Sequence, residues 1–218
     1  NCVVLKPAES ASLTLLKIAQ LAAQAGMPEG VFNVVTGAGP VCGAAIGLHP
    51  DIDVLAFTGS GGVGRRLLEY SAQSNLKRVY LELGGKSPNI IFADASNLER
   101  VAKETAASIF RNSGQVCVAA SRVIVQNSIK AELIEKVLHY TTQYKVGDPL
   151  HLNNNVGAIA NRAQLAVVEE KVAQAKAEGA TLLTGGDALL NESGGYYHAP
   201  TLFSDVTPKM KIATDVVF

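Results

Sequence analysis

A single cysteine on a short glycine-containing turn is the first candidate for chemistry in this sequence. Cys117 lies in the stretch Gly114-Gln115-Val116-Cys117-Val118, between a helical run and an extended run. A cysteine between two valines is by default a small buried hydrophobic residue. An accessible thiolate, however, can attack an electrophilic carbonyl carbon. The interpretation of Cys117 as a nucleophile therefore depends on the other motifs of the chain.

A glycine pattern marks a second candidate site. The stretch Gly59-Ser60-Gly61-Gly62-Val63-Gly64 satisfies G-x-G-x-x-G, with an apolar run before it and a helical run after it. Glycines at such a turn let the backbone approach a pyrophosphate, and the N–H groups at the start of the helix attract the anion. The pattern predicts dinucleotide or phosphate binding, and a merely tight turn between strand and helix is the alternative.

Glu82 ends the next extended run, and three roles are open to it. An acidic residue about twenty positions after the glycine pattern commonly binds the adenosine ribose. Alternation along the run places Arg78, Tyr80 and Glu82 on one side, so Glu82 can also face water or pair with Arg78. The third role is that of a partly desolvated general base. Spacing alone does not choose among the three.

The composition limits the class of partner. Nineteen basic residues balance nineteen acidic ones, so no net charge favours nucleic acid or an anionic membrane. No apolar run is long enough to span a bilayer, and we expect a cytoplasmic protein whose partners are small molecules or other subunits. The three cysteines are widely spaced, and Cys2 and Cys42 are expected to be packing residues. No histidine or cysteine spacing fits a metal, so no metal site is expected.

The hydrophobic pattern predicts strands alternating with helices, which is typical of βαβ units and a parallel sheet. Glu9 or Ser10, Ser128 and Asn161 are the expected helix caps. The expected fold class is α/β: a parallel Rossmann-like sheet, then a second α/β domain, with a border at Gly84-Gly85 that gives domains 1–84 and 85–218. Strands are expected at 2–5, 31–35, 53–57, 77–83, 89–93, 122–126, 181–183 and 196–203, and helices at 13–23, 41–48, 65–74, 98–110, 129–144 and 161–179.

Four motifs, in order and in approximate spacing, resemble those of the NAD(P)-dependent aldehyde dehydrogenase superfamily. They are Lys6-Pro7, Phe57-Thr58-Gly59-Ser60, Glu82-Leu83-Gly84-Gly85-Lys86-Ser87-Pro88 and Gly114-Gln115-Val116-Cys117. The resemblance covers essentially all 218 residues. Members of that family are more than twice as long, so the chain resembles a central segment of such an enzyme.

The resemblance implies a role for each matching residue. Cys117 takes the position of the catalytic thiol and Glu82 that of the base for the hydrolytic water, with 117 − 82 = 35 positions between them. A carboxylate at Glu9, beside the ribose, favours NAD, while Lys6 leaves NADP possible. The cofactor-binding residues implied in this way are Lys6, Glu9, Gly39, Phe57, Thr58, Gly59, Ser60, Val63, Leu83, Gly84 and Phe218.

The resemblance also implies a reaction and an assembly. The thiolate attacks an aldehyde to give a thiohemiacetal, hydride passes to the nicotinamide, and water releases a carboxylic acid from the thioester. The backbone N–H of Cys117 is expected to hold the oxyanion. Residues 1–84 would form part of the dinucleotide-binding domain and 85–218 part of the catalytic domain. The family is usually dimeric or tetrameric, so a homo-oligomer is expected.

Two departures from the family pattern leave alternatives open. The family's oxyanion-hole asparagine lies upstream of Lys6, and Asn1 does not correspond to it. Val216 stands where the family has a glutamate for the nicotinamide ribose, with Asp215 one position away. One alternative is a non-catalytic nucleotide-binding or interaction fragment. The other is acyl transfer to coenzyme A, although the presence of Glu82 favours hydrolysis.

Overall fold

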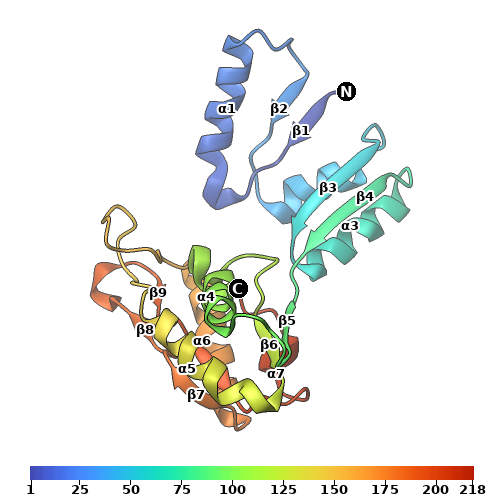
Figure 1. Ribbon diagram of the computed structural model, residues 1–218. Helices are drawn as coiled ribbons and strands as arrows, with labels where there is room; N and C mark the ends of the chain where they lie inside the picture. Colours follow the sequence, from blue (N-terminus) through green and yellow to red (C-terminus); the bar gives the residue numbers. More distant parts are fainter. The chain divides into compact units, whose positions relative to one another are not determined.

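The computed structural model describes residues 1–218 and has an α/β architecture (Figure 1). The chain divides into two compact units, Asn1–Leu83 and Gly84–Phe218. The strands form five two-stranded sheets. The pairs of the first unit are parallel, and the second unit has one parallel pair and two antiparallel pairs. The expected fold class is therefore correct, and the incomplete parallel sheet that was expected consists of separate strand pairs. Alternating apolar runs predict that strands exist, whereas the pairing of strands depends on contacts distant in sequence.

The first strand pair of unit 1 is parallel. Strand β1 (Val3–Leu5) pairs with β2 (Phe32–Val34), and helix α1 (Ser12–Gln24) connects them. The prediction that Glu9 or Ser10 caps α1 is wrong, because a 3-10 turn at Glu9–Ala11 precedes the helix and no side chain caps it. The Ser12 hydroxyl instead donates to the Ala8 carbonyl at 3.1 Å.

The second strand pair of unit 1 carries the glycine pattern. A π-helical turn (Gly39–Gly43) and α2 (Ala44–Leu48) lead to β3 (Val54–Gly59), α3 (Gly61–Gln73) and β4 (Arg78–Leu83). Strands β3 and β4 are parallel along their whole length, from Val54 opposite Arg78 to Gly59 opposite Leu83. Strand β3 extends to Gly59, beyond its predicted end, and α3 begins at Gly61 instead of Arg65. Only Ser60 therefore separates β3 from α3.

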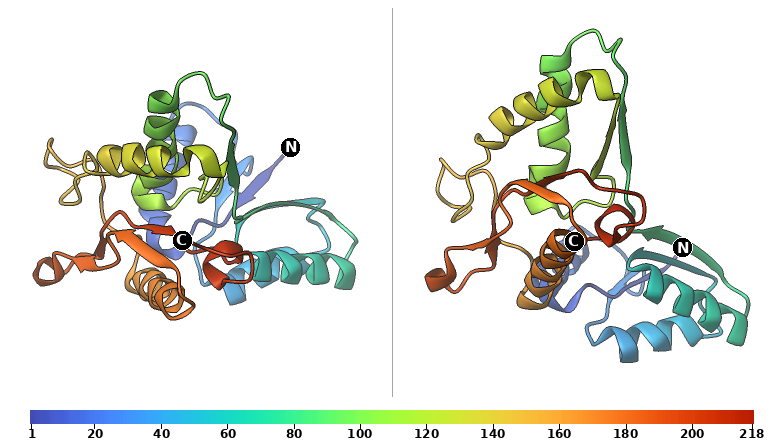
Figure 2. Two further views of the ribbon diagram at one scale, coloured as in Figure 1. Left: turned by 60° about the horizontal axis from the view of Figure 1, so that its bottom comes forward. Right: turned by 90° about the horizontal axis from the view of Figure 1, so that it is seen from below.

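Unit 2 begins with a parallel pair covered by two helices. Strand β5 (Pro88–Ile91) pairs with β6 (Arg122–Val125), and α4 (Leu98–Phe110) connects them. Helix α5 (Lys130–Thr141) lies beside α4 (Figure 2). The prediction that Ser128 caps α5 is wrong, since a 3-10 turn at Asn127–Ile129 precedes this helix as well. The buried core of this part contains Ile91, Ala102, Leu133 and Val137.

The rest of unit 2 is built on antiparallel pairs. Helix α6 begins after Asn161, whose side chain accepts a hydrogen bond from Gln164 N at 2.9 Å, as predicted. The extended run predicted at 196–203 is divided around Pro200, which has no N–H to donate to a ladder. The remaining elements are α6 (Arg162–Ala177), β7 (Thr181–Thr184) paired with β10 (Leu202–Ser204), β8 (Ala188–Leu189) paired with β9 (Tyr197–His198), and α7 (Lys211–Thr214).

The structure contains neither a helix suited to cross a membrane nor a cluster of metal-ligating side chains. None of the helices has the length and the apolar character that a bilayer crossing needs. No group of three or more histidine, cysteine, aspartate or glutamate side chains is arranged to hold a metal ion.

Candidate active site

The carboxyl ends of β1 and β2 are joined by the side chains of Lys6 and Glu9. Lys6 follows β1 directly, and its Nζ donates to the Pro7 carbonyl at 2.7 Å and to the Gly37 carbonyl, beyond β2, at 3.1 Å. Glu9 Oε1 accepts from the backbone N–H of Gly39 at 2.7 Å. The two side chains lie 3.7 Å apart, Lys6 Nζ to Glu9 Oε1. Three predicted cofactor residues, Lys6, Glu9 and Gly39, are thus brought together.

Glu9 is held in its charged form by these contacts. Hydrogen bonds from its own backbone N–H and from that of Gly39, together with the positive charge of Lys6, lower the pKa of the Glu9 carboxyl. One carboxylate oxygen, Oε1, accepts the Gly39 bond, and no hydrogen bond of the structure uses Oε2. The second oxygen is consequently available to a hydroxyl donor such as that of a ribose.

The turn between β3 and α3 presents the start of a helix. Ser60 is the N-cap of α3, and its Oγ accepts from Val63 N at 3.3 Å. Gly64 N donates to the Ser60 carbonyl at 3.0 Å. The N–H groups of Gly61 and Gly62 have no such partner, as is general for the first residues of a helix. Free N–H groups at a helix N-terminus favour an anion.

Two glycines of the pattern have neighbours that explain the residue type. A Cβ on Gly59 would clash with Cζ of the Phe57 ring, so this ring covers the end of β3. A Cβ on Gly64 would lie 3.1 Å from Leu83 Cδ2 and 3.3 Å from Leu81 Cδ1. The third glycine of the pattern therefore permits close packing of α3 on β4, which is its general role in this motif.

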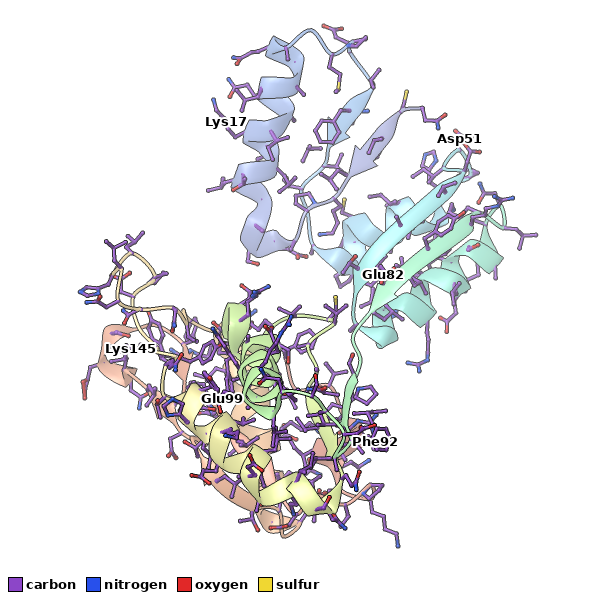
Figure 3. All side chains as sticks on the ribbon, viewed as in Figure 1. Lys17, Asp51, Glu82, Phe92, Glu99 and Lys145 are labelled. Carbon is purple, nitrogen blue, oxygen red and sulfur yellow. The ribbon has the colours of Figure 1, made fainter.

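Glu82 lies near the carboxyl end of β4, opposite Thr58 of β3 (Figure 3). The exposure of β4 alternates as predicted, with Arg78, Tyr80 and Glu82 exposed. Glu82 forms none of the ion pairs of the structure, so the predicted alternative of a pair with Arg78 is wrong. Its carboxylate is free to contact water.

Cys117 lies at a corner of a tight turn. The turn is closed by a hydrogen bond from Ala119 N to the Val116 carbonyl at 3.0 Å, so Cys117 and Val118 occupy its two central positions. Both side chains are exposed, and Cys117 is a free thiol. No hydrogen bond of the structure uses the backbone N–H of Cys117. The default interpretation of Cys117 as a buried packing residue is thus wrong, and so is that of Cys2, which is also exposed.

The segment before Cys117 is held in an unusual conformation. Asn112, Ser113 and Gly114 all have positive φ angles, of 50°, 57° and 74°. Such angles are costly for Ser113, which carries a Cβ. Two long-range hydrogen bonds hold the segment: Ser113 Oγ donates to the Gly157 carbonyl at 2.9 Å, and Gln115 Oε1 accepts from Ala160 N at 3.0 Å. The Cys117 turn is therefore anchored to a distant part of unit 2.

The stretch after α7 covers the first residue of unit 2. A Cβ on Gly84 would lie 3.3 Å from both methyl groups of Val216, so this side chain sits directly over Gly84. Phe218, a predicted cofactor residue, lies in the same stretch. Val216 therefore lies beside the Gly84 backbone. It stands at the position where the family pattern described above has a glutamate.

Two contacts that position this stretch were missed by sequence reasoning. Lys171 Nζ on α6 forms an ion pair with Asp215 Oδ2 at 2.7 Å, and the two side chains are only 17% and 32% exposed. Hydrogen bonds from Lys171 and Thr214 lower the pKa of the Asp215 carboxyl. Gln164 Nε2, also on α6, donates to the Val217 carbonyl at 2.8 Å. No local sequence pattern predicts these two contacts. Helical periodicity indicates which side chains of α6 share a face, but it does not indicate which distant residues they contact.

A family model for the aldehyde dehydrogenase family matches residues 1–218, the whole chain. The chain belongs to the aldehyde dehydrogenase family. It is 45% identical over 216 residues to aldehyde dehydrogenase family 2 member C4 of Arabidopsis thaliana. The alignment covers 99% of this chain and 42% of the relative. It is 44% identical over 218 residues to aldehyde dehydrogenase, cytosolic 1, of Elephantulus edwardii. That alignment covers 100% of this chain and 43% of the relative.

Solved structures of the aldehyde dehydrogenase family have the same fold. The chain superposes on the crystal structure of the aldehyde dehydrogenase KauB from Pseudomonas aeruginosa with a TM-score of 0.98 and 46% identity, covering 100% of this chain and 44% of that one. It also superposes on the indole-3-acetaldehyde dehydrogenase AldA of P. syringae in complex with NAD⁺ and IAA, with a TM-score of 0.98 and 44% identity. This superposition covers 100% of this chain and 44% of that one. This family member spans less than half the length of the relatives that it matches.

Proposed function

We propose that the protein oxidises an aldehyde to a carboxylic acid with NAD as cofactor, NADP being the alternative, through a thioester on Cys117. The single observation that carries the proposal is the anchored turn, which exposes the Cys117 thiol and leaves its backbone N–H without a partner. A nucleophile beside a free N–H is the arrangement that acyl chemistry requires. Family membership supports the reaction class.

The residues of unit 1 fit a dinucleotide. The free N–H groups at the start of α3, next to Ser60, suit a pyrophosphate. Nothing lies within 4 Å of a Cβ built on Gly62, so the backbone is open to a ligand there. Glu9 and Lys6 suit the ribose hydroxyls. The same proposal covers the contacts implied for Gly39, Phe57, Thr58, Gly59, Val63, Leu83, Gly84 and Phe218.

Each step of the reaction uses a group of this chain. The Cys117 thiolate adds to the aldehyde carbon, and the backbone N–H of Cys117 donates to the oxyanion of the thiohemiacetal. When bound, NAD supplies the acceptor for the hydride that leaves this carbon. Glu82 then takes a proton from water, whose oxygen attacks the thioester carbonyl. The acid leaves and the thiolate is regenerated.

The remaining assignments extend this proposal to the whole protein. Residues 1–84 would serve dinucleotide binding and residues 85–218 would carry the nucleophile. We infer a homo-oligomer, dimer or tetramer, supported by the short strand pairs whose edges are unpaired. We infer a cytoplasmic location, supported by relatives named cytosolic. A relative from Pisum sativum, 41% identical, is named peroxisomal, so localisation by microscopy is the test.

The test is to follow NADH formation with a series of aldehydes and to identify the product. Cys117→Ala should abolish NADH formation, whereas Cys42→Ala, a change at a half-buried cysteine of the π-helical turn, should retain it. Free acid as the product supports hydrolysis, and a coenzyme A thioester contradicts it. NADH formation by Cys117→Ala would refute the role of the thiol, and saturable NAD binding without turnover would identify a nucleotide-binding fragment instead.

A further inference from the structure

Unit 2 contains a large, mostly apolar cavity. Its volume is about 660 Å³, and its walls include Leu133, Val137 and Val172 from helices α5 and α6. Cavities of this size and character accommodate small organic molecules. Lys86, from the loop between β4 and β5, is one of the few cationic side chains in the wall.

Lys86 has an unusual electrostatic setting. It is half-buried, and no hydrogen bond or ion pair of the structure uses its Nζ. The charged groups that act on it are Arg122 from β6, Lys171 from α6 and Asp215 after α7. Two are cations, and the single carboxylate already pairs with Lys171 at 2.7 Å. The Lys86 ammonium therefore has no anionic partner of its own.

These surroundings favour the neutral amine. Burial, then the charge of Arg122, lowers the pKa of Lys86 from 10.5 to about 8, while Asp215 opposes the change. At pH 7 roughly one-tenth of an amine with that pKa is unprotonated, against about one part in three thousand at 10.5. Desolvated lysines of this kind are the ones that form Schiff bases with carbonyl compounds.

We propose that Lys86 is a second aldehyde-reactive group, which forms a reversible imine with short aliphatic aldehydes that enter the cavity of unit 2. The free amine adds to the carbonyl carbon, and the carbinolamine loses one water as the C=N bond replaces the C=O bond. The imine takes up one proton at neutral pH, and nothing is oxidised or reduced. The alkyl chain lies against the apolar wall. This site does not depend on Cys117 or on NAD.

The test traps the imine on the whole chain with propanal and cyanoborohydride and measures propylation of each lysine by peptide mass spectrometry. Lys209, an exposed lysine of the same unit, is the internal control. At pH 7 Lys86 should be modified at least about tenfold faster than Lys209, since its lowered pKa of about 8 leaves roughly one-tenth of Lys86 as the free amine. Lys86→Arg should lose this adduct and leave the Lys209 adduct unchanged.

Two further variants distinguish reactivity from a merely structural role. Asp215→Asn removes the one carboxylate, so the pH midpoint of Lys86 modification should fall below about 8. Lys171→Met removes a cation and releases Asp215 from its pair, so the midpoint should rise. Equal rates at Lys86 and Lys209, or midpoints that do not move in opposite directions, would overturn the proposal.

The outcome is separable from the proposed function. Cys117→Ala should form the Lys86 adduct at the parent rate even though it forms no NADH. An adduct that requires Cys117 would contradict an independent site. Conversely, loss of NADH formation with full Lys86 trapping would leave this inference intact.

Discussion

The contact between α3 and β4 allows a matched pair of substitutions that tests the packing argument. Gly62 and Gly64 lie two residues apart in the first turns of α3, and both have ordinary helical backbone angles. A Cβ on Gly62 would have nothing within 4 Å, whereas a Cβ on Gly64 would meet Leu83 Cδ2 at 3.1 Å and Leu81 Cδ1 at 3.3 Å. Gly64 is also buried and Gly62 is exposed. The two alanine variants therefore differ chiefly in packing.

The magnitudes follow from two opposing effects. Alanine in place of glycine stabilises a helix interior by up to about 1 kcal/mol, and less in the first turn. Adding a methyl group to a filled space costs about 1–3 kcal/mol. Gly62→Ala should thus be neutral or slightly more stable than the parent. Gly64→Ala should be destabilised by up to about 2 kcal/mol, so that the two variants differ by about 1–3 kcal/mol.

Urea unfolding followed by circular dichroism measures this difference. The chain contains no tryptophan, so the helical signal is a better probe than intrinsic fluorescence. With a slope of about 1–3 kcal/mol per molar urea, the two midpoints should be separated by roughly 1 M. The reasoning would be refuted by coincident midpoints, or by a Gly64→Ala variant more stable than Gly62→Ala. Either result would mean that α3 can move away from β4 at little cost.

Two other contacts of unit 2 yield stability predictions. Hydrogen bonds from Lys130, Thr181 and Ser204 lower the pKa of Asp205 from 3.8 to about 2. Since the folded-state pKa of Asp205 is below the unfolded value, the stabilisation is present above about pH 4 and is lost as pH falls through about 2. Asp205→Asn should therefore be less stable than the parent near neutral pH and equal to it below about pH 2. Urea unfolding at the two pH values measures this difference. Asn161→Ala removes the cap of α6 and should lower stability by about 1 kcal/mol, measured as a fall in melting temperature; an unchanged melting temperature would contradict the cap.

Elements with a strong local signal could be predicted from the sequence. Helix α4 was predicted at its observed bounds, because apolar residues recur at helical spacing; its cap, Asn97, was not among the predicted caps. The alternation along β4 was also predicted correctly. The caps assigned to Glu9 or Ser10 and to Ser128 were wrong for one reason. In both places a 3-10 turn precedes the helix, and composition does not distinguish the two kinds of helical turn.

The contacts that depend on distant residues could not be predicted. Lys171 and Asp215 are 44 positions apart, and Gln164 and Val217 are 53 positions apart. Neither pair alters any local pattern. The exposure of Cys117 does not follow from its own neighbours for a similar reason. Its two valine neighbours favour burial, whereas the observed turn depends on one hydrogen bond donated by Ser113 and one accepted by Gln115, each with a residue more than forty positions away.

The predicted residues of each unit gather at one edge of its parallel strands, and this placement gives the site predictions their physical basis. In unit 1, Lys6, Gly39 and Ser60 each lie beyond the carboxyl end of a parallel strand, where ligands of α/β folds generally bind. In unit 2 the relevant edge is the opposite one. Arg122 N bonds to the Ser87 carbonyl at 3.2 Å, so the Cys117 turn and the Gly84–Ser87 loop both enter the β5–β6 pair at its amino end.

The two edges also offer different chemical groups. The carboxyl-end edge of unit 1 offers free N–H groups and a charged Glu9, which suit a nucleotide and supply no nucleophile. The amino-end edge of unit 2 offers a thiol and an amine, Cys117 and Lys86, which suit a carbonyl compound. Because neither edge holds both sets of groups, a substitution of Glu9 at the unit 1 edge should change nucleotide affinity and leave the trapping of Lys86 by propanal unchanged.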